Sequence, residues 1–261
     1  MTKPRNYKTE AVIIKKTKLG EADRILTLYT PRLGKIQAVA KGVRRPRSKL
    51  SGHLELLTHS QVSFARGKNL DTITGSQTIN SFFKVKNDLV LVSYALYISE
   101  LVNKFTEDHI EDYPLFNLLL EALHNLGQSG DNELTLRCFE LHLLDHAGYR
   151  PQLQHCVTCH FTLKSVTGSF SLKAGGILCP KCSYMQPTTI NISNNCLRLL
   201  RLLQDSGFCI LPDIEVKAPT AHEAEWIIRS YIRYLLERDI KSTAWLDSLK
   251  HKQQKGQIAL L

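Results

Sequence analysis

Four cysteines in the second half of the chain have the spacing of metal ligands. They form two Cys-x-x-Cys pairs separated by nineteen residues, Cys156 with Cys159 and Cys179 with Cys182. Two residues between thiolates let one tight turn present both sulfurs to a single ion, and four thiolates complete the tetrahedral shell of a structural zinc. We therefore predict one structural Zn²⁺ in a zinc-ribbon-like hairpin. His155 and His160 flank the first pair as alternative ligands.

Thiol chemistry is the alternative use of these cysteines. A thioredoxin-like site has one Cys-x-x-Cys pair that opens a helix after a strand, whereas here two pairs face each other across a predicted hairpin. The chain has no G-x-x-x-x-G-K-[ST], H-E-x-x-H or G-x-S-x-G pattern, and His142 and His146 lack the intervening glutamate of a zinc protease. We therefore expect neither an enzyme nor a small-molecule substrate, and a thiol enzyme remains an alternative hypothesis.

Residues 32–54 carry a different chemistry, the recognition of polyanions. This stretch, RLGKIQAVAKGVRRPRSKLSGHL, holds seven Lys and Arg and no acidic residue. Residues 1–54 have 14 Lys and Arg against three acidic residues, a net charge of +11, whereas the remainder of the chain has a net charge of −1. Such asymmetry predicts that one domain binds nucleic acid or an acidic membrane surface. Gly42, Pro46, Ser48 and Gly52 favour a strand that runs into a loop.

The elements that must position this stretch are short strands. Five segments rich in Val, Ile, Thr and Tyr are predicted as strands: Ala11–Thr17, Ile25–Thr30, Lys35–Ala40, Leu54–Phe64 and Thr72–Ile79. Five strands in about eighty residues are too many for a single exposed sheet and indicate a small closed barrel. An OB-type barrel fits the strand count and the charge, although an SH3-like barrel gives a similar sequence pattern.

Beyond Phe83 the apolar period becomes helical. Helices are predicted over Asp88–Asp108, from Pro114 to near Gly127, and over Asn132–Ala147, Asn195–Gln204 and Ala221–Arg238. Thr220 and Glu223 form a capping-box pattern for the last of these helices, whose predicted apolar stripe is Trp226, Ile227, Tyr231, Tyr234 and Leu235. Residues beyond Lys250 are expected to fray.

The fold class is therefore α+β multidomain. The predicted parts are an OB-fold DNA-binding domain (1–83), a helical domain in two parts (84–149 and 188–250), an inserted four-cysteine zinc module (150–187) and a C-terminal tail (251–261). The first ten residues lack the apolar core of a signal peptide, and the most apolar run, Leu89–Ile98, is about half the ~18–20 residues of a membrane span. We expect a soluble cytoplasmic protein that does not bind membranes and keeps its thiols reduced.

Residues 20–55, GEADRILTLYTPRLGKIQAVAKGVRRPRSKLSGHLE, resemble the signature of the RecO family of bacterial recombination mediators. The family pattern is G-E-x-D-R-I-L, then L-G-K-I-x-A-x-A-K-G-x-R, then S-K-L. The resemblance continues in LRCFELHLLDHAGYRP (136–151), in the two cysteine pairs with Gly175-Gly176 ahead of the second, and in RSYIRYLLERDIKSTAWL (229–246) as a C-terminal helix. It covers nearly the whole chain.

The resemblance implies a function that composition cannot show. RecO-type proteins bind single- and double-stranded DNA, anneal complementary strands without ATP and act with RecR. They contact the acidic C-terminal tail of single-strand-binding protein and help to load RecA, which implies a location at the nucleoid. The competing hypothesis is a zinc-ribbon RNA- or ribosome-associated binding protein, because such a protein would share the basic barrel.

On the resemblance, the basic stretch contacts phosphates. The predicted contacts are Lys35, Lys41, Arg44, Arg45, Arg47 and Lys49, with Arg24 and Arg32 as weaker candidates. Arg24 has an alternative role beside Asp23, since the two either pair or lock a barrel turn. Tyr29 and Phe64 are candidates for base stacking, and equally for the barrel core.

Overall fold

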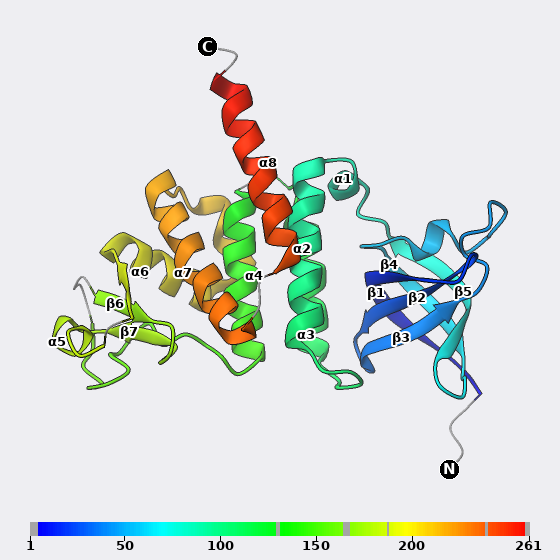
Figure 1. Ribbon diagram of the computed structural model, residues 1–261, viewed down its shortest axis with the longest axis horizontal. Helices are drawn as coiled ribbons and strands as arrows, with labels where there is room; N and C mark the ends of the chain where they lie inside the picture. Colours follow the sequence, from blue (N-terminus) through cyan, green and yellow to red (C-terminus); the bar gives the residue numbers. More distant parts are fainter. Residues whose placement is uncertain (1–4, 129–130, 164–167, 187, 238–239, 259–261) are drawn as a thin grey trace. The chain divides into compact units, whose positions relative to one another are not determined.

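The computed structural model describes residues 5–128, 131–163, 168–186, 188–237 and 240–258, the last nine of these by their backbone alone. The chain divides into two compact units (Figure 1). The first consists of residues 1–124 and 242–261, and the second of residues 125–241.

The first unit is built on a closed five-stranded barrel. Its strands are β1 (Asn6–Leu19), β2 (Asp23–Thr30), β3 (Gly34–Ala40), β4 (His59–Ala65) and β5 (Asp71–Asn80), in the order β1-β2-β3-β5-β4. β3 and β5 pair in parallel and all other neighbours are antiparallel. This arrangement is the OB-type barrel and confirms the predicted fold class. The fourth strand begins five residues later than predicted, because Gly52–Leu54 form a short 3-10 helix, η1.

The barrel encloses one apolar core. Alternate residues of each strand point inward, and Val43 and Leu54 close the core from the segment that follows β3. Tyr29 and Phe64 are both 0% exposed, so they belong to the packed interior of this unit. The hypothesis that either ring stacks on bases is therefore wrong.

Helices complete the first unit. They are α1 (Phe83–Lys86), α2 (Leu89–Phe105), α3 (Tyr113–Asn125) and α8 (Lys241–Ile258). The Asp88 carboxylate accepts the first free N–H groups of α2, and Glu100 on α2 accepts the Ser242 N–H at 2.9 Å. Phe116 of α3 packs against the rings of Tyr29 and His59. The expectation of a frayed tail is wrong, since α8 continues to Ile258.

The second unit combines helices that pack on one another with a small three-stranded sheet. Its helices are α4 (Asn132–His146), α5 (Pro180–Ser183), α6 (Asn194–Ser206) and α7 (Ala218–Leu236), with a 3-10 segment η2 (Gly207–Asp213). The strands β6 (Gly168–Ser171), β7 (Gly176–Leu178) and β8 (Ile190–Ile192) pair in the order β7-β6-β8. β6 and β7 form the predicted hairpin, with Gly175 in its turn at φ +65°.

The last two helices differ from their prediction. α7 begins at Ala218, because a proline in its first turn is already constrained to helical φ, and the N-cap is Lys217 instead of Thr220. The predicted capping box is wrong, since Glu223 accepts hydrogen bonds from Ser193. The predicted apolar stripe is partly wrong, because two of its members lie on the surface: Trp226 is 55% and Tyr234 46% exposed. The predicted single C-terminal helix is two helices, α7 and α8.

No helix in the described parts of the chain is long and apolar enough to cross a membrane.

Candidate nucleic-acid interface and metal centre

The basic loop, residues 41–51, is fastened to the barrel at its first residues. The Asp23 carboxylate accepts the Gly42 N–H at 2.7 Å, and the Arg44 N–H donates to the Ala22 carbonyl at 3.0 Å. The Val43 side chain between them is only 7% exposed and belongs to the barrel core. Asp23 therefore holds this turn in place, which is one of the two roles predicted for Asp23 with Arg24. Gly42 has φ +62°, a conformation that favours glycine.

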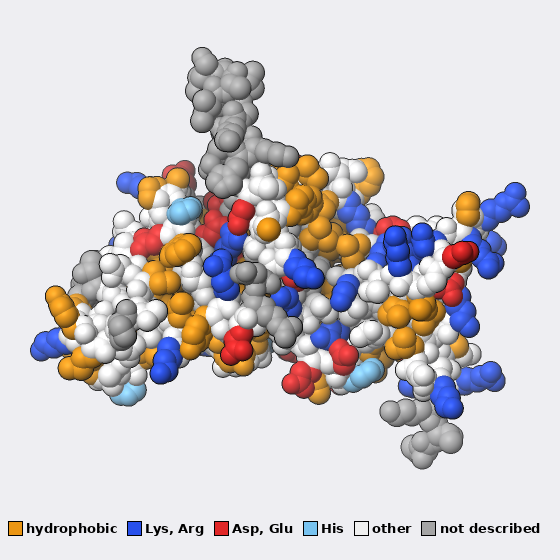
Figure 2. Space-filling view, viewed as in Figure 1, with side chains coloured by type: hydrophobic (Ala, Val, Ile, Leu, Met, Phe, Trp, Pro, Cys, Tyr) orange, Lys and Arg blue, Asp and Glu red, His pale blue; other side chains and the backbone are white. Residues whose placement is uncertain are grey.

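The cationic side chains of this loop all face solvent. Successive turns, in which the Arg45 N–H bonds to the Gly42 carbonyl and the Ser48 N–H to the Arg45 carbonyl, spread them apart. Figure 2 shows Lys and Arg side chains gathered over the barrel. Within the described residues, no carboxylate lies within ion-pair distance of these five exposed side chains: Lys41, Arg44, Arg45, Arg47 and Lys49. Their charge is therefore available to an anionic ligand.

Strand pairing brings further cations to the loop. Arg24 on β2 lies opposite Lys18 on β1 and Ala40 on β3, so both cations are at the end of the barrel where the loop begins. Lys15 is exposed on β1 as well. Sequence reasoning counted Lys15 and Lys18 in the charge of the domain but did not name them as site residues, because only the register places Lys18 at the loop end and Lys15, opposite Thr27, nearer the middle of the strands.

Lys35 has a different environment from the loop cations. Its ammonium group donates hydrogen bonds to the carbonyls of Asn103 (2.9 Å) and Thr106 (2.6 Å), lies 3.4 Å from Asp108, and its side chain is 12% exposed. Gly34, at φ +59°, approaches Ile110 so closely that a Cβ would lie 1.9 Å from the Ile110 carbonyl oxygen. The Gly-Lys pair therefore fastens the segment after α2 to the barrel. These contacts favour a structural role for Lys35 over the predicted phosphate contact.

The cysteines meet as predicted. The four sulfurs of Cys156, Cys159, Cys179 and Cys182 all lie within 4.8 Å of one another. Sulfurs bound to one zinc at ~2.3 Å lie roughly 3.8 Å apart in a tetrahedron, and the sulfurs of Cys159 and Cys179 are separated by 3.7 Å. The cluster therefore fits one metal ion of that size. Neither His155 nor His160 is part of it.

Backbone groups prepare this cluster for a cation. Burial raises the pKa of Cys156, but hydrogen bonds to the backbone around Cys159, Cys179 and Thr158 outweigh burial and lower it to about 6. The hydrogen bond with the Cys179 thiol, and burial, raise the pKa of Cys182 to about 12. The pKa values of these two thiols are therefore shifted in opposite directions. A metal ion would displace the remaining protons.

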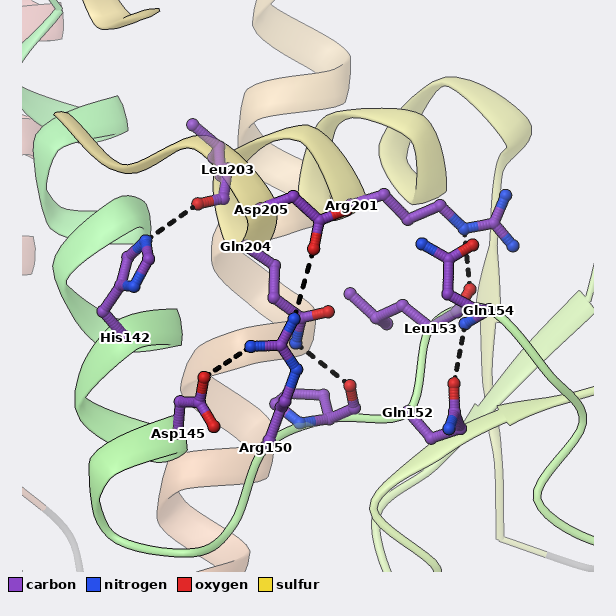
Figure 3. A network of polar contacts seen from close by, with 11 residues as sticks. His142, Asp145, Arg150, Gln152, Leu153, Gln154, Arg201, Leu203, Gln204 and Asp205 are labelled. Atoms are coloured by element: carbon purple, nitrogen blue, oxygen red, sulfur yellow. Dashed lines mark hydrogen bonds and ion pairs between the residues drawn. The ribbon is translucent and has the colours of Figure 1, made fainter. Parts of the chain in front are cut away.

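Two polar side chains of α6 hold the metal-binding hairpin in place (Figure 3), where this name covers the two cysteine pairs and the β6–β7 hairpin between them, residues 151–163 and 168–182. Arg201 donates to the Leu153 carbonyl at 2.7 Å, and the buried Gln204 amide donates to the Pro151 carbonyl at 3.0 Å. Arg201 also donates to the Leu163 carbonyl at 2.7 Å. Arg150 binds the carboxylates of Asp145 and Asp205 in the same network. These contacts fix the chain on both sides of the first cysteine pair.

His142 belongs to this network. Its Nε2 lies 3.2 Å from the Leu203 carbonyl, and burial lowers its pKa. It is therefore a half-buried structural residue and does not form a second metal site with His146 in the described part of the chain.

The fold and these sites define a class of protein, an OB-type barrel with an exposed cationic loop, followed by a second unit that carries a four-cysteine cluster able to hold one metal ion. Residues 1–82 match the family model "Recombination protein O N terminal", and residues 86–244 match "Recombination protein O C terminal". The chain belongs to the RecO family of DNA repair proteins.

The chain is similar in sequence to individual relatives over nearly its whole length. The chain is 46% identical to the DNA repair protein RecO of Dehalococcoides mccartyi strain 195 over 95% of this chain and 98% of that protein. It is 40% identical to the RecO protein of Roseiflexus sp., over 94% of this chain and 87% of that protein. It is 34% identical to the RecO protein of Halalkalibacterium halodurans, over 94% and 95% of the two chains.

Proposed function

We propose that this protein is a DNA repair and recombination mediator that binds single- and double-stranded DNA through the basic loop and anneals complementary strands without ATP. The observation that carries the proposal is the set of five exposed cations at the end of an OB-type barrel, none of them engaged by a carboxylate of the described chain. Phosphates of either DNA form would displace counterions at this surface.

The mechanism is electrostatic. Five phosphate contacts give a slope of log K against log salt of about −3.5 on single strands, at ~0.7 for each contact. Arg24 and Arg32 are weaker contacts in this scheme. Because phosphates carry no sequence information, binding shows little sequence preference. Neutralising the backbones of two complementary strands lowers their mutual repulsion, which is a sufficient physical basis for annealing without nucleotide hydrolysis.

The partners follow from family membership. We propose that the protein acts with RecR, contacts the acidic C-terminal tail of single-strand-binding protein, and helps to load RecA onto DNA coated by that protein. It works in the cytoplasm at the nucleoid, performs no catalysis, and takes no small-molecule substrate. One Zn²⁺ in the cysteine cluster is structural, because four thiolates leave no open coordination position for chemistry.

Strand annealing on DNA coated with single-strand-binding protein tests the proposal. The wild-type protein should anneal coated strands, and should anneal them more slowly when the coating protein lacks its acidic tail. The triple variant Arg44→Ala/Arg45→Ala/Arg47→Ala should reduce the salt slope on single strands by about 2, at ~0.7 per contact. A matched control removes three exposed cations of the second unit: Lys173→Ala/Arg198→Ala/Lys217→Ala.

Two outcomes contradict the proposal. An annealing rate that the loop variant and the control reduce equally would show that net charge acts instead of this surface. A higher affinity for structured RNA than for single-stranded DNA would favour the RNA-binding alternative.

A further inference from the structure

A second polar site lies on the same barrel, away from the basic loop. It is a cavity of about 490 Å³ near the turns that precede β3 and β5. This volume lies within the ~300–1,000 Å³ range of small-ligand sites. Its polar lining combines two arginines, two carboxylates and two amides with two aromatic rings: Arg32, Arg66, Asp71, Asp108, Gln37, Asn69, Tyr7 and His109.

A stack of three planar groups stands at this cavity. The Tyr7 ring packs on Phe64 with centroids 4.9 Å apart and an interplanar angle of 12°, and the Arg66 guanidinium carbon lies 4.8 Å from the centre of the Tyr7 ring. Phe64 is fully buried, Tyr7 is half-buried and Arg66 is exposed. The stack therefore runs from the barrel core to the surface and ends in a flat cationic group.

The turn that carries Arg66 is rigidly built. Asp71 accepts hydrogen bonds from the Tyr7 hydroxyl at 2.6 Å and from the Gly67 N–H at 3.0 Å. A Cβ on Gly67 would lie 1.9 Å from the Leu70 carbonyl oxygen, so the turn requires glycine. The stack and the edge of the cavity are thus held in place before any ligand arrives, which limits the entropy that binding must remove.

The lining selects among ligands. An apolar ligand would leave the amides of Gln37 and Asn69 and the charged group of Arg32 without hydrogen bonds. A bare phosphate would use Arg32 but neither amide, and it would also face the carboxylates of Asp71 and Asp108, which suit the donors of a base edge better. A nucleotide meets all of these groups, since it has a π-face for the guanidinium, base-edge donors and acceptors for the amides, and a phosphate for Arg32.

We propose that this cavity, the base pocket, binds one unstacked base of single-stranded DNA. The base stacks on the Arg66–Tyr7 pair, and Arg32 contacts the adjacent phosphate. This inference rests on the proposed function and deepens it, because it names a base-binding subsite in addition to the phosphate surface.

The barrel offers a path between the two sites. β3 begins near the base pocket and ends at the basic loop, and its seven residues span roughly 23 Å at ~3.3 Å each. On the outer face, Lys15 of β1 and Gln37 of β3 are exposed in one cross-strand row. A single strand that engages both sites fits the ~4–16 nucleotides that an OB fold covers. An intact duplex keeps its bases paired and engages the basic loop alone.

The substitution Arg66→Lys tests the base pocket, because lysine keeps the charge and removes the planar face. Binding is measured on three DNAs of equal length: a normal single strand, a single strand of abasic sites, and a duplex. We expect the wild-type protein to bind the normal strand more tightly than the abasic strand. Arg66→Lys should lose roughly fivefold or more in affinity for the normal strand, from the stacking of one base. Its affinity for the abasic strand and the duplex should stay within twofold of wild type.

A neighbouring charge gives the matched control. Lys68 is exposed in the same turn and does not line the pocket. Lys68→Gln should weaken binding to all three DNAs alike, if at all. An unchanged thermal unfolding midpoint for Arg66→Lys confirms that the barrel is folded.

The outcomes separate the two proposals. Equal wild-type affinity for normal and abasic strands, or equal losses on both for Arg66→Lys, would overturn the base pocket and leave the phosphate surface standing. Absence of DNA binding by the wild-type protein would overturn the proposed function itself.

Discussion

The basic loop is an irregular segment and the metal-binding hairpin contains the strand pair β6–β7, and different groups hold the two in place. The loop is fastened by backbone hydrogen bonds, the Asp23 carboxylate and the buried Val43 side chain. The hairpin is fastened by side chains, the four cysteines together with Arg201 and Gln204. The cationic side chains of the loop contribute little to holding it, with one exposed contact of 3.4 Å from the Arg44 guanidinium to the Gly20 carbonyl, whereas the hairpin is held by its cysteines. This difference predicts that stability and DNA binding are separable.

Removing the metal site should have the largest effect. Cys156→Ser removes one ligand, and structural zinc contributes an apparent ~10–16 kcal/mol in zinc-finger peptides, so we expect the second unit to lose several kcal/mol of unfolding free energy. Native mass spectrometry should find one zinc per wild-type chain and none in the variant, and the thermal unfolding of the second unit should shift to lower temperature.

The same variant tests the comparison directly. Affinity of Cys156→Ser for single-stranded DNA should stay within about twofold, since the basic loop belongs to the other unit. Cys209→Ser is the control, because this exposed cysteine lies outside the cluster. A metal-free wild-type chain with unchanged thermal unfolding would disprove the structural role of the cysteines.

Lys35 tests, within the first unit, whether residues that stabilise the fold are distinct from those that bind DNA. It is a cation of the basic stretch whose contacts are those of a structural residue. Lys35→Met leaves two carbonyls without their charged donor, and we expect a loss of about 2–4 kcal/mol in unfolding free energy from two such hydrogen bonds. Urea denaturation measures this loss.

DNA binding gives the second half of the Lys35 test. The salt slope of DNA binding by Lys35→Met should equal that of the wild type. The triple loop variant should instead reduce the salt slope and change the free energy of unfolding by no more than roughly 0.5 kcal/mol per substitution. A slope reduced by ~0.7 in Lys35→Met at unchanged stability would restore Lys35 as a phosphate contact.

Local patterns predicted the barrel, the helices and the cysteine cluster, because each of these is encoded in contiguous periodicity or in fixed spacing. They could not assign Lys35, since the carbonyls that it binds lie 68 and 71 residues away. The capping role predicted for Glu223 was wrong for the same reason. It has the spacing of a capping residue for α7, but Ser193, thirty residues upstream, donates hydrogen bonds to its carboxylate. Charge and periodicity thus predict which elements form, while long-range polar contacts decide which cations stay available.

Lowering the pH should have the smallest of these effects on stability. In the barrel unit it acts by protonating His59. Burial lowers the pKa of His59 below its usual value of 6.5, although the hydrogen bond to Glu10 opposes this shift. The folded unit therefore binds a proton at His59 less readily than the unfolded chain does. The stability that the neutral ring contributes is present above pH 6.5 and is lost as the pH falls through the lower folded-state pKa.

Urea denaturation between pH 7.5 and 5 measures this loss, and His59→Gln should flatten it because glutamine does not titrate. Burial also lowers the pKa of His142, which lies in the second unit. His142→Gln is therefore the control variant, and it should leave the unfolding of the barrel unit unchanged. A barrel that becomes more stable as the pH falls through this range would contradict the assignment of His59 as a buried neutral ring. DNA affinity of the loop should vary little over the same range, because its cations are lysines and arginines that stay charged throughout.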